Sequence, residues 1–168
     1  MQRRTLLTLG IASAAVLAVA GGTAALLRPG LHTGVLTDAG REVFSAMGRG
    51  ILDKSLPDQE GPRQIALQGL LARIDVLAQG LAPHAQTELS QLLSLLASAP
   101  GRLVMTGLAT PWATASVADI QQALQGMRVS GLAIRQQAYA ALHDITAGAY
   151  FSDSATWALL GYPGPLNV

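Results

Sequence analysis

Residues 64–98 read QIALQGLLARIDVLAQGLAPHAQTELSQLLSLLAS, and this stretch decides the fold class. Apolar side chains recur every third or fourth position in both halves, which is the spacing of one helix face. Gly80 and Pro83 interrupt the pattern between the halves. We therefore predict two amphipathic helices, residues 64–79 and 84–98, the second ending at Pro100-Gly101. Their apolar faces are Leu67, Leu70, Leu71, Ile74 and Leu77, and Ala85, Leu89, Leu92, Leu93 and Leu96.

A third helix is predicted upstream of this stretch. Thr37-Asp38 can cap a helix that should stop near Leu56-Pro57. Its apolar face would comprise Val43, Phe44, Met47 and Ile51. Residues 58–62 are polar and contain glycine and proline, so we expect a loop between this helix and the next.

The downstream half begins with an irregular segment and continues with two more helices. Residues 102–115 contain scattered glycine, proline and threonine, and Trp112 is expected to anchor this segment. Ser116 followed by Asp119 resembles a capping box. It would open a helix with an inner face of Val117, Ile120, Leu124 and Met127. A last long helix, residues 132–147, would use Ile134, Ala138, Leu142 and Ile145, and an aromatic tail rich in glycine and proline follows it.

Composition agrees with an all-α domain. The chain has 168 residues, 50% of them apolar but only 4% aromatic, which favours helices over strands. We predict a small bundle of about five helices over residues 31–168, after an N-terminal targeting helix in residues 1–30. Glycines within the helical patterns are expected to permit close helix packing. These are Gly48, Gly50, Gly69, Gly126 and Gly131.

The N-terminus has the pattern of an export signal. Arg3 and Arg4 precede an uncharged, mildly apolar stretch from Thr5 to Leu27, which is typical of twin-arginine signals. Gln2 and Leu6 depart from the usual residues around the pair. We therefore predict a periplasmic location, reached through the twin-arginine translocase.

The fate of this segment has two readings. Ala18-Val19-Ala20 offers the small residues that a signal peptidase needs, so Ala18 and Ala20 mark a possible cleavage site. The stretch of about 23 residues could equally cross a bilayer and remain as an inner-membrane anchor. Cleavage would remove Arg3 and Arg4 and leave nine basic and ten acidic residues. This near-neutral balance does not indicate a basic surface for binding nucleic acid.

The sequence contains no constellation that would carry catalysis. There is no cysteine, and His32, His84 and His143 are widely separated, so neither a thiolate nucleophile nor a zinc site is indicated. No glycine-rich phosphate loop follows a strand. His143 and Asp144 are adjacent, but neighbours on a helix point about 100° apart, so we expect no acid–base pair. Four aspartates, Asp53, Asp75, Asp144 and Asp153, are expected to be solvated or capping residues.

Five of the seven aromatic residues lie in the last thirty positions: Tyr139, Tyr150, Phe151, Trp157 and Tyr162. Aromatic side chains are favoured as anchors at protein interfaces. The alternative is that they close the end of the protein's own bundle. Both readings predict that the segment is ordered.

The C-terminal motif resembles a known family. Residues 157–165 read WALLGYPGP, preceded by Arg135, Tyr139, Leu142 and Tyr150. This pattern is similar to small twin-arginine-signal proteins related to the third subunit of gluconate 2-dehydrogenase and the small subunit of sorbitol dehydrogenase. The likeness covers about residues 102–165.

The resemblance implies a non-catalytic accessory subunit of an FAD-dependent sugar or alcohol dehydrogenase. FAD would be held by a large subunit of the glucose–methanol–choline type, and haem c by a possible cytochrome c subunit. The docking motif that the resemblance implies is Trp157 with Gly161, Tyr162, Pro163, Gly164 and Pro165. Three further candidate docking residues follow from their aromatic side chains: Trp112, Tyr150 and Phe151. One alternative is a stand-alone periplasmic or membrane-anchored binding module with a pocket among Trp112, Tyr150 and Trp157. A hydrolase is a third reading, without a visible nucleophile.

Overall fold

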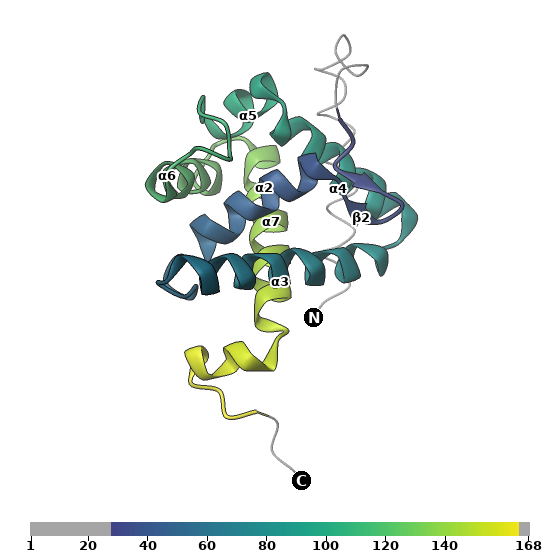
Figure 1. Cartoon of the computed structure of the whole chain (residues 1–168). Helices are drawn as coiled ribbons and strands as arrows, with labels where there is room; N and C mark the ends of the chain where they lie inside the picture. Colours follow the sequence, from purple (N-terminus) through teal and green to yellow (C-terminus); the bar gives the residue numbers. More distant parts are fainter. Residues whose placement is uncertain (1–27, 165–168) are drawn as a thin grey trace.

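The computed structural model describes residues 28–164, and helices form most of this range (Figure 1). A short hairpin, β1 (Leu31–His32) and β2 (Val35–Leu36), comes first. The helices are α2 (Asp38–Ile51), α3 (Glu60–Gln79), α4 (Pro83–Ala97), α5 (Ala99–Thr106), α6 (Val117–Arg128) and α7 (Ala133–Phe151), followed by the 3₁₀ helix η2 (Ser154–Leu160). The predicted all-α class is confirmed. Arg3, Arg4, Ala18 and Ala20 lie outside the described residues.

Helix α2 lies at the centre of the bundle. Val43, Phe44 and Met47 are completely buried, and the helix packs against α3, α4, α6 and α7. Thr37 caps it as predicted, because its side chain accepts a hydrogen bond from the Gly40 backbone N–H at 3.4 Å. The predicted apolar stripe therefore forms the middle of the core, although Ile51 at its end is only partly buried.

The β-hairpin is an element that the sequence pattern does not predict. Its two-residue turn places Thr33 at φ 50° and Gly34 at φ 79°, the positive φ values that such tight turns require. Asp75 of α3 accepts hydrogen bonds from the Leu36 backbone N–H at 2.8 Å and from Arg41 at 2.6 Å. This carboxylate ties the hairpin to α2 and α3, so Asp75 is a structural residue rather than a merely solvated one.

Two helix glycines serve close packing as predicted, whereas three do not. A Cβ on Gly48 would lie 2.8 Å from leucine side chains of α3. A Cβ on Gly50 would lie 2.5 Å from Cγ2 of Ile120 in α6. A Cβ would meet no side chain of another helix at three positions, Gly69, Gly126 and Gly131.

The predicted irregular segment 102–115 is wrong over its first residues, because α5 continues to Thr106. Ser98 ends α4 and also caps α5, accepting from the Gly101 N–H at 3.1 Å. Pro100 lies in the first turn of α5, where a backbone N–H has no helical partner to lose. A Cβ on Gly101 would lie 2.1 Å from the Leu95 carbonyl oxygen, so only glycine fits this corner. Gly107, with φ 76°, caps the C-terminal end of α5.

Other helix ends also differ from the predicted boundaries. Helix α2 stops at Ile51 and a turn follows, in which the Leu56 N–H bonds to the Leu52 carbonyl at 2.8 Å. Helix α3 begins at Glu60, inside the predicted loop, because Pro62 lies in its first turn and breaks no helical hydrogen bond. Helix α7 continues to Phe151, four residues beyond the predicted end.

The connection from α5 to α6 is anchored as predicted. Trp112 is buried, and its indole N–H donates to the Leu96 carbonyl at 2.8 Å. Arg49 of α2 donates to the carbonyl of Trp112 and, at 3.0 Å, to that of Ala115. Ser116 caps α6 by accepting from the backbone N–H of Asp119 at 3.1 Å. The Asp119 carboxylate accepts from the Ser116 hydroxyl at 2.7 Å, instead of completing a reciprocal capping box.

Candidate partner-docking site

The C-terminal aromatic residues begin inside the bundle. Tyr150 is buried near the end of α7, and its hydroxyl donates to the Ser55 carbonyl at 2.8 Å. Its ring meets the half-buried Phe151 edge to face, with centroids 5.2 Å apart. Burial raises the pKa of the Tyr150 phenol above its ordinary value. Tyr150 therefore closes the protein's own core, the alternative that sequence analysis left open for these aromatics.

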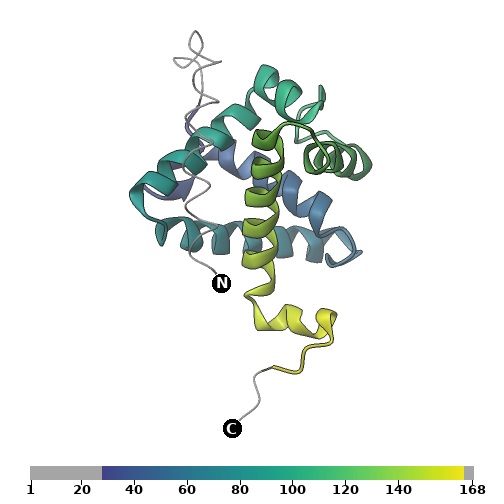
Figure 2. The same ribbon diagram turned by 180° about the vertical axis from the view of Figure 1, so that it is seen from behind.

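Beyond Tyr150 the chain leaves the bundle. Residues 152–164, here called the C-terminal hook, extend past α3 and away from the other helices (Figures 1 and 2). Arg73 of α3 holds the base of the hook. It donates to the Ala149 carbonyl at 2.7 Å and pairs with the Asp153 carboxylate at 3.1 Å. Asp153 in turn accepts from the Ala155 N–H at 3.0 Å and so caps η2.

Local contacts fold the hook around Trp157. Its indole N–H donates to the Phe151 carbonyl at 3.0 Å, and the Tyr162 ring meets the indole with centroids 5.3 Å apart. Gly161 ends η2 at φ 67°, a conformation that favours glycine. Gly164 lies against the indole as well, since a Cβ there would be 3.7 Å from it. The structure describes this segment up to Gly164, and Pro165 lies outside the described residues.

The tip of the hook carries apolar side chains on the surface. Leu160 is 58% exposed and Tyr162 is 48% exposed, whereas Trp157 is half-buried. Exposed large apolar side chains that are held by a defined backbone lose little conformational entropy on docking. The hook can therefore offer an ordered apolar contact to a partner.

The structure does not assemble the pocket of the alternative binding module. Trp112 and Tyr150 are buried and Trp157 is half-buried. Each is fixed by a different carbonyl, that of Leu96, Ser55 or Phe151. The prediction of Trp112 as a docking residue is therefore wrong for the folded chain, because its side chain is only 1% exposed.

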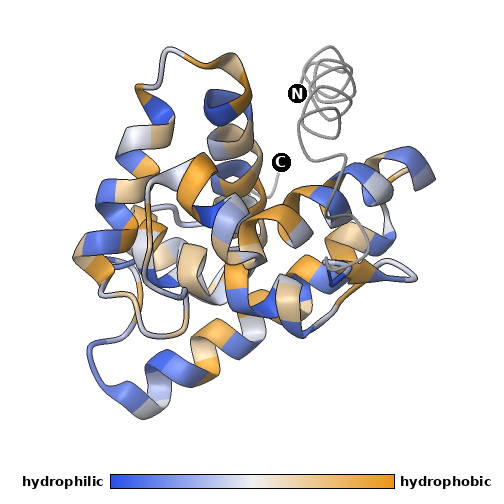
Figure 3. Cartoon of the chain, turned by 90° about the horizontal axis from the view of Figure 1, so that it is seen from above, coloured by the Kyte–Doolittle hydropathy of each residue, from blue (hydrophilic) through white to orange (hydrophobic). Residues whose placement is uncertain are grey.

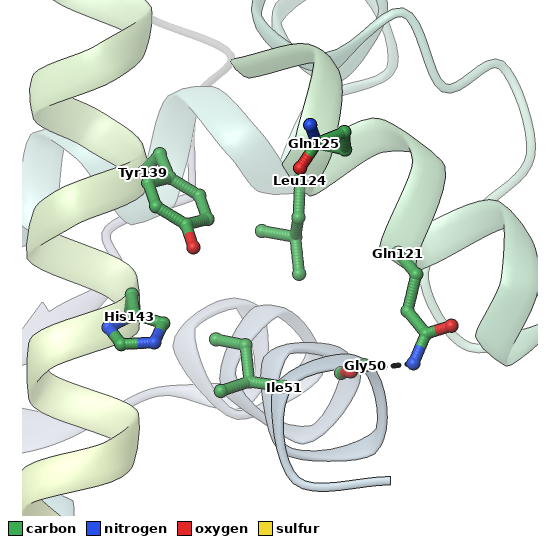
Figure 4. A pocket seen from close by; sticks show the side chains of 7 residues that line it. All are labelled: Gly50, Ile51, Gln121, Leu124, Gln125, Tyr139 and His143. Carbon is green, nitrogen blue, oxygen red and sulfur yellow. Dashed lines mark hydrogen bonds between the residues drawn. The ribbon is translucent and has the colours of Figure 1, made fainter. Parts of the chain in front are cut away.

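A shallow hollow of about 190 Å³ lies elsewhere, between α2, α6 and α7 (Figure 4). His143 and Tyr139 stand at its α7 side, with ring centroids 5.6 Å apart. His143 Nδ1 lies 3.2 Å from the Asp144 carboxylate, so the expectation that these neighbours do not meet is wrong. Asp144 is 77% exposed, and solvent weakens such a pair. The residues that line the hollow are Gly50, Ile51, Gln121, Leu124, Gln125, Tyr139 and His143.

Within residues 28–164, no three acidic, histidine or cysteine side chains gather where they could hold a metal ion. No helix in this range is both long and apolar enough to cross a membrane. No protein-family model, curated protein or solved structure matches the chain.

Sequence analysis missed Arg73, which lies 76 positions before the carbonyl it binds in α7. Asp153 caps η2, in agreement with its prediction as a solvated or capping residue, but its ion pair with Arg73 was not predicted. No local motif marks either residue, because their roles arise only when α3 packs across the end of α7.

Proposed function

We propose that this chain is a non-catalytic accessory subunit of a periplasmic or membrane-bound FAD-dependent dehydrogenase of the glucose–methanol–choline type. It supplies the export signal, through Arg3 and Arg4, and stabilises the flavoprotein by a direct contact. The observation that carries the proposal is the hook, a segment that projects from the bundle (Figure 1) and in which Leu160 and Tyr162 are exposed. The sequence of the hook is also where the chain resembles dehydrogenase small subunits.

An export signal on a separate subunit is useful for a flavoprotein. The twin-arginine route carries folded proteins, and a flavoprotein that has bound FAD in the cytoplasm is already folded. A large subunit without its own signal can cross with a partner that has one. This role requires a contact that forms before export and survives it, and the hook offers such a contact.

The test is recovery of the flavoprotein from solubilised membranes with the tagged full chain. The recovered material is expected to show a stoichiometric flavin spectrum and, where a cytochrome subunit is present, a haem spectrum. The chain purified alone is expected to be colourless and without dehydrogenase activity. Flavin bound to the chain alone, or no flavoprotein in the recovered material, would contradict the proposal.

Point variants separate docking from folding. Tyr162→Asp places a charge on the exposed tip of the hook, and Val76→Asp places the same charge on an exposed position of α3 (71% exposed). Tyr162→Asp is expected to reduce flavoprotein recovery at least tenfold with an unchanged melting temperature, because desolvating a charge in an apolar contact is costly. Val76→Asp should leave both unchanged. Equal recovery with both variants would show that the hook does not dock.

A further inference from the structure

The end of the molecule opposite the hook exposes a second apolar surface. Leu103 and Val104 of α5, and Val129 and Leu132 at the corner between α6 and α7, are 52% to 65% exposed. Arg135 in the first turn of α7 donates to the Val104 carbonyl, which joins the two parts. Figures 1 and 2 show α5 beside the α6–α7 corner at the top of the bundle. These four residues are here called the upper face.

Three arginines lie on the helices that carry the upper face. Between residues 89 and 143 the chain has three basic residues, Arg102, Arg128 and Arg135, and one acidic residue, Asp119. Asp119 lies in the first turn of α6, the end away from Arg128.

Arg102 lies in α5 and is only 4% exposed. Its Nη2 donates to the Ala109 carbonyl at 3.2 Å, its Nε has no partner, and among the described residues it forms no ion pair. A buried cation without a carboxylate leaves a positive potential at this end of the molecule.

The other end of α7 carries charges of both signs. Asp53 and Asp58 in the connection from α2 to α3, and Glu60 at the start of α3, are accompanied by Lys54 and Arg63. The Tyr150 hydroxyl holds this connection through the Ser55 carbonyl, and Asp153 begins the hook. Arg73 pairs with Asp153 at this end, whereas Arg102 at the upper face has no carboxylate partner among the described residues, so the two ends of α7 differ in whether their cations are paired.

The N-terminal segment also leads to this end. The hairpin turn at Gly34 approaches Gln86 of α4, and Gly30 approaches Ser90 and Leu93 further along the same helix. Followed backwards from the turn, the chain thus runs toward the end of α4, where Ser98 leads directly into α5. At residue 28 it meets the apolar stretch of about 23 residues, which is long enough to cross a bilayer.

We propose that the upper face lies on the surface of a bilayer containing anionic phospholipid. Exposed leucine and valine can enter the interfacial layer while neighbouring arginines contact phosphate groups, the combination that holds amphipathic surfaces on membranes. Figure 3 looks onto this end and shows apolar and hydrophilic residues interspersed on it. The inference does not depend on the identity of the flavoprotein.

The test uses the full chain, with residues 1–27 intact, in vesicles of phosphatidylcholine with or without phosphatidylglycerol. The chain has no cysteine, so single cysteines can carry an environment-sensitive fluorophore. Val104→Cys and Leu132→Cys report on the upper face. Ile65→Cys and Val76→Cys, equally exposed on α3, are the controls. Lipid-attached nitroxide quenches probes that touch the bilayer.

The upper-face probes are expected to be quenched several-fold more than the α3 probes, and more strongly with phosphatidylglycerol. In Arg128→Gln, the population whose upper face contacts the bilayer should fall about fivefold relative to the population whose upper face does not. One cation near an anionic surface contributes about a factor of five to this ratio. Arg63→Gln at the start of α3 should change nothing.

Equal quenching at all four positions would overturn the proposal. So would an upper-face signal that appears without lipid and grows with protein concentration, because a second copy would then cover this face. A signal that appears only after the flavoprotein is added would assign the face to that partner instead. Melting curves of each labelled variant confirm that it is folded.

Discussion

The clamp at the base of the hook provides the sharpest test of how the hook is held. In Arg73→Met the aliphatic stem is kept and the guanidinium is lost. The variant loses the hydrogen bond to the Ala149 carbonyl and the ion pair with Asp153. Both contacts connect α3 to the last turn of α7 and the start of η2. We therefore expect the hook to open in a protein whose bundle remains folded.

The cost follows from the two contacts. A hydrogen bond from a charged donor contributes about 1.5–3 kcal/mol. The ion pair is worth about 0–1 kcal/mol, because the Arg73 and Asp153 side chains are 28% and 37% exposed. Because Ala149 lies in the last turn of α7, this total, near 2 kcal/mol, applies to opening of that turn together with the hook, and it would raise the population of this open form about thirtyfold.

Limited digestion with chymotrypsin measures this opening, because Trp157 and Tyr162 are cleavage sites within the hook. Arg73→Met is expected to speed cleavage there more than tenfold. Arg63→Met is the matched control: this α3 arginine donates to the carbonyls of Pro57 and Asp58, away from the hook. Cleavage in the hook at the same rate in both variants would refute the clamp, whatever the change in melting temperature.

Three further predictions concern packing, export and pH. Gly50→Ala should lower the free energy of unfolding by about 1–2 kcal/mol through its 2.5 Å contact with α6. Gly126→Ala, with open space at its Cβ, should raise it by up to about 1 kcal/mol; urea titrations measure both, and a shift in the same direction would contradict the packing argument. Replacing both Arg3 and Arg4 by Lys should block twin-arginine export, and unchanged periplasmic accumulation would disprove that route. Because the pKa of Tyr150 is raised in the folded state, its contribution to the free energy of unfolding is fully present below pH ~10 and is lost as the pH rises through the folded-state pKa. Tyr150→Phe should remove this pH-dependent loss of stability, which melting curves at alkaline pH measure.

The periodic part of this fold could be predicted from sequence. The stripe with Phe44 and Met47 became the centre of the core, and the spacing of Leu89, Leu93 and Leu96 placed α4 correctly. Such predictions succeed because the buried face of a helix carries apolar side chains at every third or fourth position. Capping by Thr37 and Ser116 succeeded for a similar reason, since a cap depends on residues three positions apart.

The errors have a common physical origin in tertiary contacts. Pro100-Gly101 looked like a stop signal, yet proline is tolerated in a first helical turn and Gly101 is required by the nearby Leu95 carbonyl. The hairpin has only two residues in each strand, too few to show an alternating pattern. Trp112 looked like an interface anchor because burial and interface roles favour the same side chains.

The candidate site illustrates the same limit. The aromatic residues of the hook were visible in the sequence, but their division into core and surface was not. Tyr150 is buried because the connection from α2 offers a carbonyl at Ser55, 95 positions away. Tyr162 is exposed because η2 turns away from the bundle after Arg73 holds its base. Neither outcome has a local cause.

The two proposed contacts lie at opposite ends of one helix, and this arrangement has a consequence that can be measured. Helix α7 has 19 residues and so spans about 28 Å. Perturbations that far apart, without shared partners, add in free energy. A flavoprotein docked on the hook would therefore be held at a fixed height above the bilayer, while each contact keeps its own affinity. Combining Tyr162→Asp with Arg128→Gln should lower membrane-bound flavoprotein by the product of the two single effects. A combined loss far from that product would show that the two ends share one contact.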